Sequence, residues 1–337
     1  MRIDVEFTSL GASLCGWLLQ PDVELAPAVV MAHGFSATRS MTIDKLAEAF
    51  CSAGFAVLLY DHRGFGASEG TPSRQVNAWV QTRGYLDAVA FLSQLDGVDP
   101  DRIAVWGDSL SAGAACVAAA INERIGAIVV QVPAFGASEP PIDTDGELFQ
   151  ELRSMVLSSD VLGCGGPVQG PLPVVSSDQI RHPSALKPLT AFRWFVEYGG
   201  TLDSNWVNDV TLSLEGWQPG LCGPHLRQPV LMLVAPQDEM ARANPQVARA
   251  VFDSVRGPKE WYAIGGGHFG LLYHPSDLFS EARAVQLGFL RRWADGAMAR
   301  SVAVATSHVT DTDALSQPAH CNRIRSFSQS SRAGEGD

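Results

Sequence analysis

Residues 106–113 read WGDSLSAG, and this stretch decides the fold. The apolar run just before it, at 103–106, predicts a strand, and the small residues of 111–120 predict a helix just after it. A nucleophilic serine requires such a strand-turn-helix arrangement, because a sharp turn lifts its hydroxyl above the edge of the sheet. The stretch therefore predicts that Ser109 is a nucleophile on a tight turn.

The turn also requires small residues two positions before and after the serine, because the helix backbone passes close to the strand there. Gly107 and Ser111 occupy those positions. The usual pattern has glycine at both, so Ser111 departs from it, although a serine is small enough to fit. The alternative is an ordinary helix N-terminus that Ser109 or Asp108 caps.

Strands and helices alternate along the chain on both sides of this turn. Strands are predicted at 28–32, 56–60, 103–106, 125–132, 229–235 and 259–264, and helices at 43–50, 76–95, 111–120, 244–255 and 279–297. This alternation indicates an α/β fold with a mostly parallel, doubly wound sheet. Two further strands, at 3–7 and 14–19, are expected to form an antiparallel edge on it.

The alternation breaks at Pro133, which suggests an insertion in the core. Residues 136–227 are irregular and rich in Pro, Gly and aromatic residues, with one predicted helix at about 190–198. We interpret them as a lid over the carboxyl edge of the sheet, where open α/β sheets bind ligands. The core then comprises 1–135 and 228–297, and the Ser- and Thr-rich tail, 298–337, is expected to be disordered.

A serine hydroxyl needs a base, and the sequence offers partners in the order serine, acid, histidine that suits this fold. The strand at 231–235 ends in Pro-Gln-Asp, which places Asp238 at the carboxyl edge of the sheet, with Glu239 as its neighbouring competitor. The next strand is followed by three glycines and His268. We therefore expect His268 to be the general base and Asp238 to orient its imidazole.

Acyl chemistry also needs donors for the oxyanion that forms. The strand that ends at residue 32 continues into His33-Gly34-Phe35. We expect the backbone N–H groups of Phe35 and Leu110 to converge as an oxyanion hole, and His33 to brace the loop. The motif DHRGFGAS at 61–68 resembles a catalytic site, but we interpret it as a glycine-rich turn in which Asp61 and Arg63 form hydrogen bonds.

Charge and composition exclude several classes of function. The net charge of −12 over 337 residues leaves no basic stripe for nucleic acid. No apolar run approaches the length of a membrane span, and the first residues, MRIDVEFTS, lack the core of a signal peptide. The six cysteines are scattered, which is typical of reduced thiols in a cytoplasmic protein. No cluster has metal-ligand spacing, so neither metal nor cofactor is expected.

Several motifs together resemble the α/β-hydrolase superfamily. They are HGF at 33, DHRGFGASEG at 61, VDPDRIAVWGDSLSAG at 98, WVNDVTL at 206, PVLMLVAPQDEM at 229 and GGGHFG at 265. More closely, residues 1–297 resemble the dienelactone-hydrolase-like and X-prolyl-peptidase-like branch, which includes fungal polyketide transferases and thiohydrolases. The resemblance implies hydrolysis or transfer of an acyl group without a cofactor.

The chain departs from this branch beside the nucleophile. Relatives often have Thr-Ser-Tyr there, whereas this chain has Asp108-Ser109-Leu110. Leu110 removes any help that a phenol hydroxyl gives to the oxyanion. The role of Asp108 stays open, because a carboxylate beside the serine either changes local pKa values or faces away.

We expect an esterase or thioesterase that acts on a small to medium, largely apolar acyl compound. An acyltransferase or an amidase with the same triad is the alternative, and a non-catalytic binding protein is a distant one. Aromatic residues of the first loop and the lid are candidates for the pocket wall, although aromatics also pack as lid core. They are Phe35, Phe135, Trp194, Phe195, Trp206 and Trp217.

Overall fold

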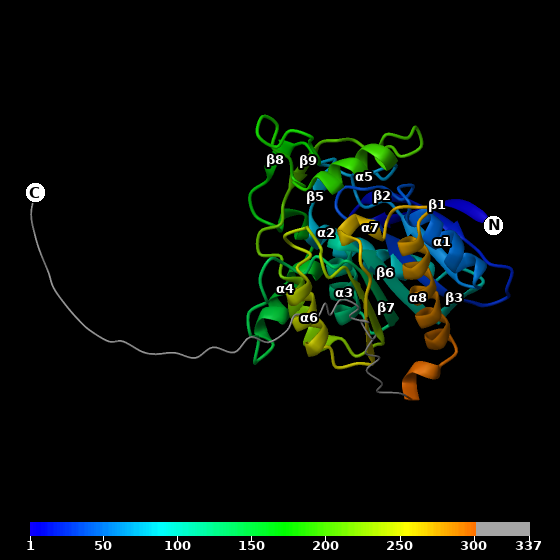
Figure 1. Ribbon diagram of the computed structural model, residues 1–337. Helices are drawn as coiled ribbons and strands as arrows, with labels where there is room; N and C mark the ends of the chain where they lie inside the picture. Colours follow the sequence, from blue (N-terminus) through cyan, green and yellow to red (C-terminus); the bar gives the residue numbers. More distant parts are fainter. Residues whose placement is uncertain (301–337) are drawn as a thin grey trace, which may run out of the picture. The chain divides into compact units, whose positions relative to one another are not determined.

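The computed structural model describes residues 1–300, which form an eight-stranded sheet between layers of helices (Figure 1). The strands lie in the order β1-β2-β4-β3-β6-β7-β10-β11. Neighbouring strands from β4 to β11 are parallel, and β2 pairs antiparallel with both β1 and β4. The bounds are β1 (Arg2–Ser9), β2 (Ala12–Leu19), β3 (Ala26–Ala32), β4 (Ala56–Tyr60), β6 (Val98–Asp108), β7 (Ile125–Gln131), β10 (Val230–Val234) and β11 (Lys259–Ala263). The predicted parallel sheet with an antiparallel edge is confirmed.

Helices cover both faces of this sheet, as a doubly wound fold requires. Helices α1 (Ile43–Ser52) and α8 (Asp277–Ala294) lie on one face, and α2 (Ala78–Leu92), α3 (Ser109–Ile121) and α6 (Pro245–Ser254) lie on the other (Figure 1). The central strands are buried on both sides, so their sequences are continuous apolar runs rather than alternating ones.

Helix α2 is shorter than its predicted range of 76–95. The Asn77 side chain accepts hydrogen bonds from the backbone N–H groups of Trp79 and Val80, which caps the helix there. The two residues before the cap form β5 (Gln75–Val76) instead. The Asn77 cap thus sets the start of α2, whereas the apolar pattern alone predicted a longer helix.

The insertion between β7 and β10 contains more regular structure than the single predicted helix. Its elements are α4 (Glu147–Leu157), η1 (Val161–Gly163), β8 (Gln169–Leu172), α5 (Leu189–Gly199), β9 (Val210–Leu212) and η2 (Pro219–His225). Strands β5, β9 and β8 form a second, three-stranded sheet. Such short strands carry too few residues for a periodic signal.

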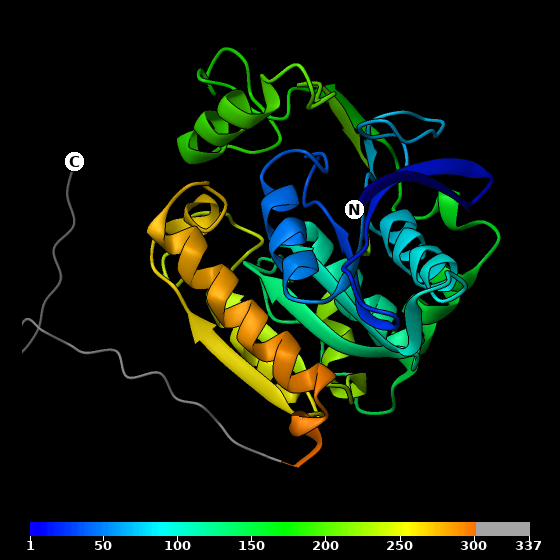
Figure 2. The same cartoon turned by 90° about the vertical axis from the view of Figure 1, so that its right-hand side faces the viewer.

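Figures 1 and 2 show that the insertion has two parts. Helix α5 and the small sheet lie at the end of the molecule where the parallel strands finish, near α7 (Gly267–Gly270). Helix α4 and η2 instead pack beside α2, α3 and α6. Of the segment predicted to be a lid, only the part around α5 therefore lies at the carboxyl edge of the sheet.

Two sequence-based expectations concern the ends of the chain and its compartment. A short 3₁₀ helix, η3 (Ala297–Arg300), follows α8, and the remainder of the tail predicted to be disordered lies outside the described residues. Within residues 1–300, none of the helices has the length and apolar character needed to cross a bilayer.

Candidate active site

Ser109 lies at the junction of β6 and α3, in a strained backbone conformation. Its φ is 52°, a left-handed value that a non-glycine residue adopts only where the surrounding structure enforces it. The Ala134 N–H donates a 2.9 Å hydrogen bond to the Ser109 carbonyl and helps to hold the turn. A Cβ on Gly107 would lie 2.5 Å from the Ser111 carbonyl oxygen, so this position has room only for glycine.

The structure brings Ser109, His268 and Asp238 into one chain of hydrogen bonds. His268 Nε2 lies 3.0 Å from Ser109 Oγ, and His268 Nδ1 lies 2.7 Å from Asp238 Oδ2. The other Asp238 oxygen accepts a 2.8 Å hydrogen bond from the Met240 N–H, which fixes the carboxylate. The His268 and Asp238 side chains are buried, and this arrangement can move a proton from the serine to the imidazole.

Glu239, the competing acid, does not contact the imidazole. One of its oxygens accepts a 2.8 Å hydrogen bond from the backbone N–H of His268, and the other accepts one from the Thr190 hydroxyl of α5. Partial burial raises the Glu239 pKa, but these hydrogen bonds outweigh it and the net shift is downward. Glu239 therefore joins the lid helix to the histidine loop and is more than a surface charge.

The two residues whose backbone N–H groups are proposed for the oxyanion both lie close to Ser109. Phe35 follows β3, and Leu110 is in the first turn of α3, where N–H groups have no carbonyl partner within the helix. A Cβ on Gly34 would lie 3.1 Å from Ser109 Cβ, which shows how closely the Phe35 loop approaches the serine. This close approach depends on the glycine.

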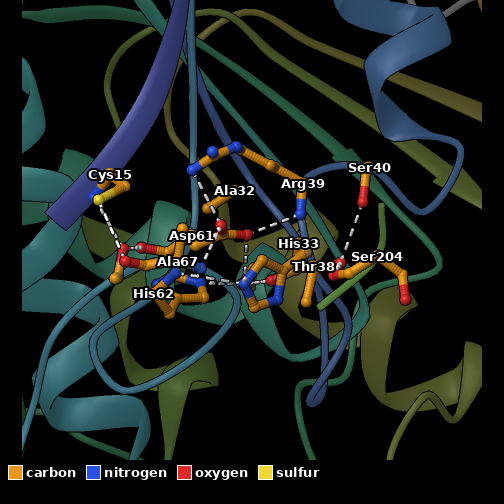
Figure 3. A network of polar contacts seen from close by, with 12 residues as sticks. Cys15, Ala32, His33, Thr38, Arg39, Ser40, Asp61, His62, Ala67 and Ser204 are labelled. Atoms are coloured by element: carbon orange, nitrogen blue, oxygen red, sulfur yellow. Dashed lines mark hydrogen bonds and ion pairs between the residues drawn. The ribbon is translucent and has the colours of Figure 1, made fainter. Parts of the chain in front are cut away.

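A buried polar network braces that loop from below. The Ser111 hydroxyl donates a 2.5 Å hydrogen bond to the His33 carbonyl and lies 2.8 Å from His62 Nε2. The His62 N–H in turn donates to His33 Nε2 at 3.2 Å (Figure 3). Burial lowers the pKa of both imidazoles, so both are neutral near pH 7. Sequence reasoning treated Ser111 only as a small residue and missed its hydroxyl contacts.

Asp61 and Arg63 form hydrogen bonds, as expected of the glycine-rich turn. Asp61 accepts from the backbone and guanidinium of Arg39 at 2.8 and 3.0 Å, and from the Ala67 N–H at 3.1 Å (Figure 3). Arg63 donates to backbone carbonyls, including that of Leu10. Both side chains hold loops together.

Two cavities meet at Ser109 and Phe35. The small cavity, of about 30 Å³, lies between Asp108, Trp194, Phe195, His268, Phe269 and Leu272. The large cavity, of about 420 Å³, lies between Leu110, Leu186, Pro188, Leu212, Leu214 and Met240. Ser109 is therefore open to two largely apolar cavities of different size.

Three of the six aromatic candidates line these cavities. Phe35 borders both, and Trp194 and Phe195 border the small one. The other three, Phe135, Trp206 and Trp217, border neither. Trp217 packs edge-on against Trp79 with ring centroids 5.0 Å apart, and Trp206 lies behind Phe195 at 5.3 Å.

Sequence reasoning missed several aliphatic and aromatic wall residues. Leu186, Met240, Phe269 and Leu272 all line a cavity beside the serine. Met240 and Phe269 follow Glu239 and His268 directly, so proximity to the motifs was an available signal. Leu186 and Leu272 carried no such signal.

Asp108 is buried beside Ser109 and borders the small cavity. Only 5% of the residue is exposed, and its Oδ1 has no hydrogen-bond partner among residues 1–300. Burial raises the pKa of this carboxyl to about 7, although the nearby His268 opposes that shift. The site therefore holds a second titratable carboxyl that does not belong to the chain of hydrogen bonds around His268.

No set of His, Cys, Asp and Glu side chains in the described part of the chain could hold a metal ion. The five cysteines in that part are free thiols.

Comparison with known proteins agrees with this architecture. Residues 24–266 match the family model described as serine aminopeptidase, S33. The quorum-quenching protein AidA of Acinetobacter baumannii is 28% identical over 86% of this chain and 94% of its own length. The polyketide transferase ATR5 of Stachybotrys chlorohalonatus is 30% identical over 80% of this chain and 91% of its own.

A solved structure extends the likeness to three dimensions. The α/β hydrolase GrgF from Penicillium sp. sh18 superimposes with a TM-score of 0.68 and 26% sequence identity. The match covers 89% of this chain and 99% of that one.

Proposed function

The chain belongs to the serine aminopeptidase S33 family of α/β-hydrolases, and on that premise we propose that it is a serine hydrolase in which Ser109, His268 and Asp238 act as a triad. Its proposed substrate is a carboxylic ester or thioester of a small to medium, largely apolar acyl compound. The observation that carries the proposal is the chain of hydrogen bonds from Ser109 through His268 to Asp238, at 3.0 and 2.7 Å, in the wall of two cavities.

The first half of the reaction forms an acyl-enzyme. His268 Nε2 takes the proton from Ser109 Oγ as that oxygen attacks the acyl carbon, and Asp238 stabilises the imidazolium that results. The carbonyl oxygen becomes an oxyanion, to which the backbone N–H groups of Phe35 and Leu110 donate. When the tetrahedral intermediate collapses, His268 returns the proton to the departing oxygen or sulfur and the bond to the leaving group breaks.

The second half releases the acyl group. A water molecule gives a proton to His268 and attacks the acyl carbon, and the proton returns to Ser109 Oγ as the ester bond to the enzyme breaks. An alcohol or amine in place of water yields acyl transfer by the same steps. Relatives named as polyketide transferases favour this second candidate, as does the tight, apolar cavity on the His268 side.

The proposal is tested with a fluorophosphonate probe, which labels an activated serine covalently. We expect one label per chain on Ser109 of the wild type and none on Ser109→Ala. Because a triad acts as a unit, His268→Ala should lower kcat about as much as Ser109→Ala, and the double variant should lose little more. Labelling that persists in Ser109→Ala would overturn the assignment.

The choice between hydrolysis and transfer needs a product measurement. One p-nitrophenyl ester is incubated with the wild type in the presence of a short alcohol. The measured quantity is the ratio of the free acid, the product of hydrolysis, to the new ester, the product of transfer. Predominance of the new ester at millimolar alcohol would favour the transferase.

We place the protein in the cytoplasm, with a small molecule as its partner. Reduced thiols are typical of that compartment, and the five cysteines of the described chain are free. The solved relative DcsB forms a complex with a substrate analogue, which is consistent with a small-molecule site.

A further inference from the structure

The two cavities at Ser109 indicate how the proposed substrate is oriented, with its leaving group on one side of the serine and its acyl chain on the other. A leaving group must accept its proton from His268, and His268 borders the small cavity but not the large one. The leaving group therefore lies on the side of the small cavity. The acyl chain then extends into the large cavity, past Leu110 and Phe35.

The large cavity suits an acyl chain of medium length. Its volume of about 420 Å³ falls in the usual range of small-molecule sites. Its wall is mostly apolar and contains three charged residues, Lys187, Glu239 and Arg242. Those charges decide what the far end of the chain can be.

The acidic residue of this wall, Glu239, already has hydrogen-bond partners within the chain. Both carboxylate oxygens of Glu239 accept hydrogen bonds, one from the Thr190 hydroxyl and one from the His268 N–H. Lys187 and Arg242, unlike Glu239, have no such partner within residues 1–300. Both are exposed, and neither side chain forms an ion pair or donates a hydrogen bond within residues 1–300.

The charge of the whole chain makes this pair of cations unusual. Acidic residues outnumber basic ones by 36 to 24. A Lys or Arg on this surface is therefore expected to have an acidic neighbour more often than a basic one. Even so, two cations without a partner border the same apolar cavity as the nucleophile. Complementary charge at a binding site contributes to specificity more than to raw affinity.

We propose that the acyl group of the substrate ends in an anion of the carboxylate class, and that Lys187 and Arg242 bind that anion. The inference rests on the proposed function, because it takes the direction of the substrate from the role of His268. It narrows the substrate from apolar acyl compounds to hemiesters or thioesters of dicarboxylic acids.

The test uses pairs of esters that differ only at the far end of the acyl chain. Mono-p-nitrophenyl adipate is compared with p-nitrophenyl hexanoate, and the suberate with the octanoate. The measured quantity is the ratio of kcat/KM within each pair. Two exposed charge pairs are worth roughly three- to tenfold, so the wild-type ratio should favour the carboxylate by about that factor in at least one pair. Added salt should reduce the ratio.

Variants assign the preference to the two cations. Lys187→Gln combined with Arg242→Gln should bring the ratio to about one or below. Arg153→Gln removes one positive charge, as each of these substitutions does, but from an exposed position on α4 outside both cavities, and it should keep the wild-type ratio. Lys187→Arg should keep most of it, because the charge remains.

Several outcomes would overturn the inference. A wild-type ratio of one or less in both pairs would do so, as would a preference that survives in the double variant. A third pair, S-hexanoyl pantetheine with and without its 4′-phosphate, places the anion in the leaving group instead. A preference confined to that pair would contradict the acyl-side assignment. If the wild type turns over neither hexanoate nor adipate, the proposed function itself fails.

Discussion

Asp238 and Glu239 are adjacent carboxylates with different tasks, because neighbouring residues that leave a strand point in different directions. Asp238 faces His268 Nδ1 at 2.7 Å, and Glu239 faces the backbone N–H of the same histidine at 2.8 Å. The first contact sets the tautomer of the imidazole, and the second sets only the position of its loop.

We expect the loss of these two contacts to have different effects on kcat. Asp238→Asn keeps the shape but reverses the hydrogen-bonding preference of the imidazole, so kcat should fall by roughly 10⁴. Glu239→Gln keeps an acceptor and should change kcat by less than about tenfold. Both values are measured on one ester. If Glu239→Gln loses most of its activity and Asp238→Asn keeps it, the acid of the triad is Glu239 and not Asp238.

Asp108 should lower the stability of the fold at neutral pH. Its pKa is about 7 in the folded chain and near 3.8 when exposed, so the folded state holds a proton that the unfolded state releases between these values. Stability from this group is therefore lost as pH rises from about 4 to about 7. Above about 7 the loss is constant, at up to about 4 kcal/mol.

Asp108→Asn tests this dependence because asparagine does not titrate. The variant should gain stability over the wild type, and the gain should be larger at about pH 8 than at about pH 5 in denaturant unfolding. Asp99→Asn is the control: partial burial raises the Asp99 pKa, but a 2.6 Å bond from Arg102 outweighs it and the net shift is downward. Asp99 is therefore ionised in both the folded and the unfolded state at about pH 5 and at about pH 8, and Asp99→Asn should lose a similar amount of stability at both. A pH-independent effect of Asp108→Asn would contradict the buried, protonated carboxyl.

At the scale of elements, helix α5 is connected to the loop of His268 through one hydroxyl and the Glu239 carboxylate. Thr190, in the first turn of α5, donates to Glu239, which holds the His268 N–H. We therefore expect this helix to influence the position of the loop that carries His268. The other end of α5 is tied differently, since the Thr201 hydroxyl donates to the Tyr198 carbonyl.

Thr190→Val should weaken catalysis without unfolding the lid. Valine keeps the branched shape and removes the donor, so we expect kcat to fall severalfold with a melting temperature within a few degrees of wild type. Thr201→Val removes a hydroxyl beyond the other end of the helix and should leave kcat unchanged. Equal losses in the two variants would show that the effect comes from general loosening of α5.

At the scale of the whole molecule, the sheet and its covering helices supply the stability, and the tail should add little. Residues after 300 contain few large apolar side chains, so they have little surface to bury. Truncation after Arg300 should leave the melting temperature and turnover within error of the full chain. A loss of many degrees would mean that the tail docks on the domain.

The sequence by itself determined the sheet and the three residues of the proposed triad, because these follow from local patterns. Apolar runs of strand length, the small residues around Ser109 and the glycines before His268 are all readable within a few positions. The order of the elements then places the ends of parallel strands at one edge. Hence residues 159 positions apart, such as Ser109 and His268, were expected together, and the structure brings them to 3.0 Å.

Only the tertiary structure decided what surrounds them. The insertion lacks a period, so sequence could not tell Trp194, which lines the small cavity, from Trp217, which packs on Trp79. The second sheet joins Gln75 to Thr211, strands too short to leave a pattern. Which side of a loop a side chain faces depends on contacts from distant segments, and those contacts set the cavity walls and the different tasks of Asp238 and Glu239.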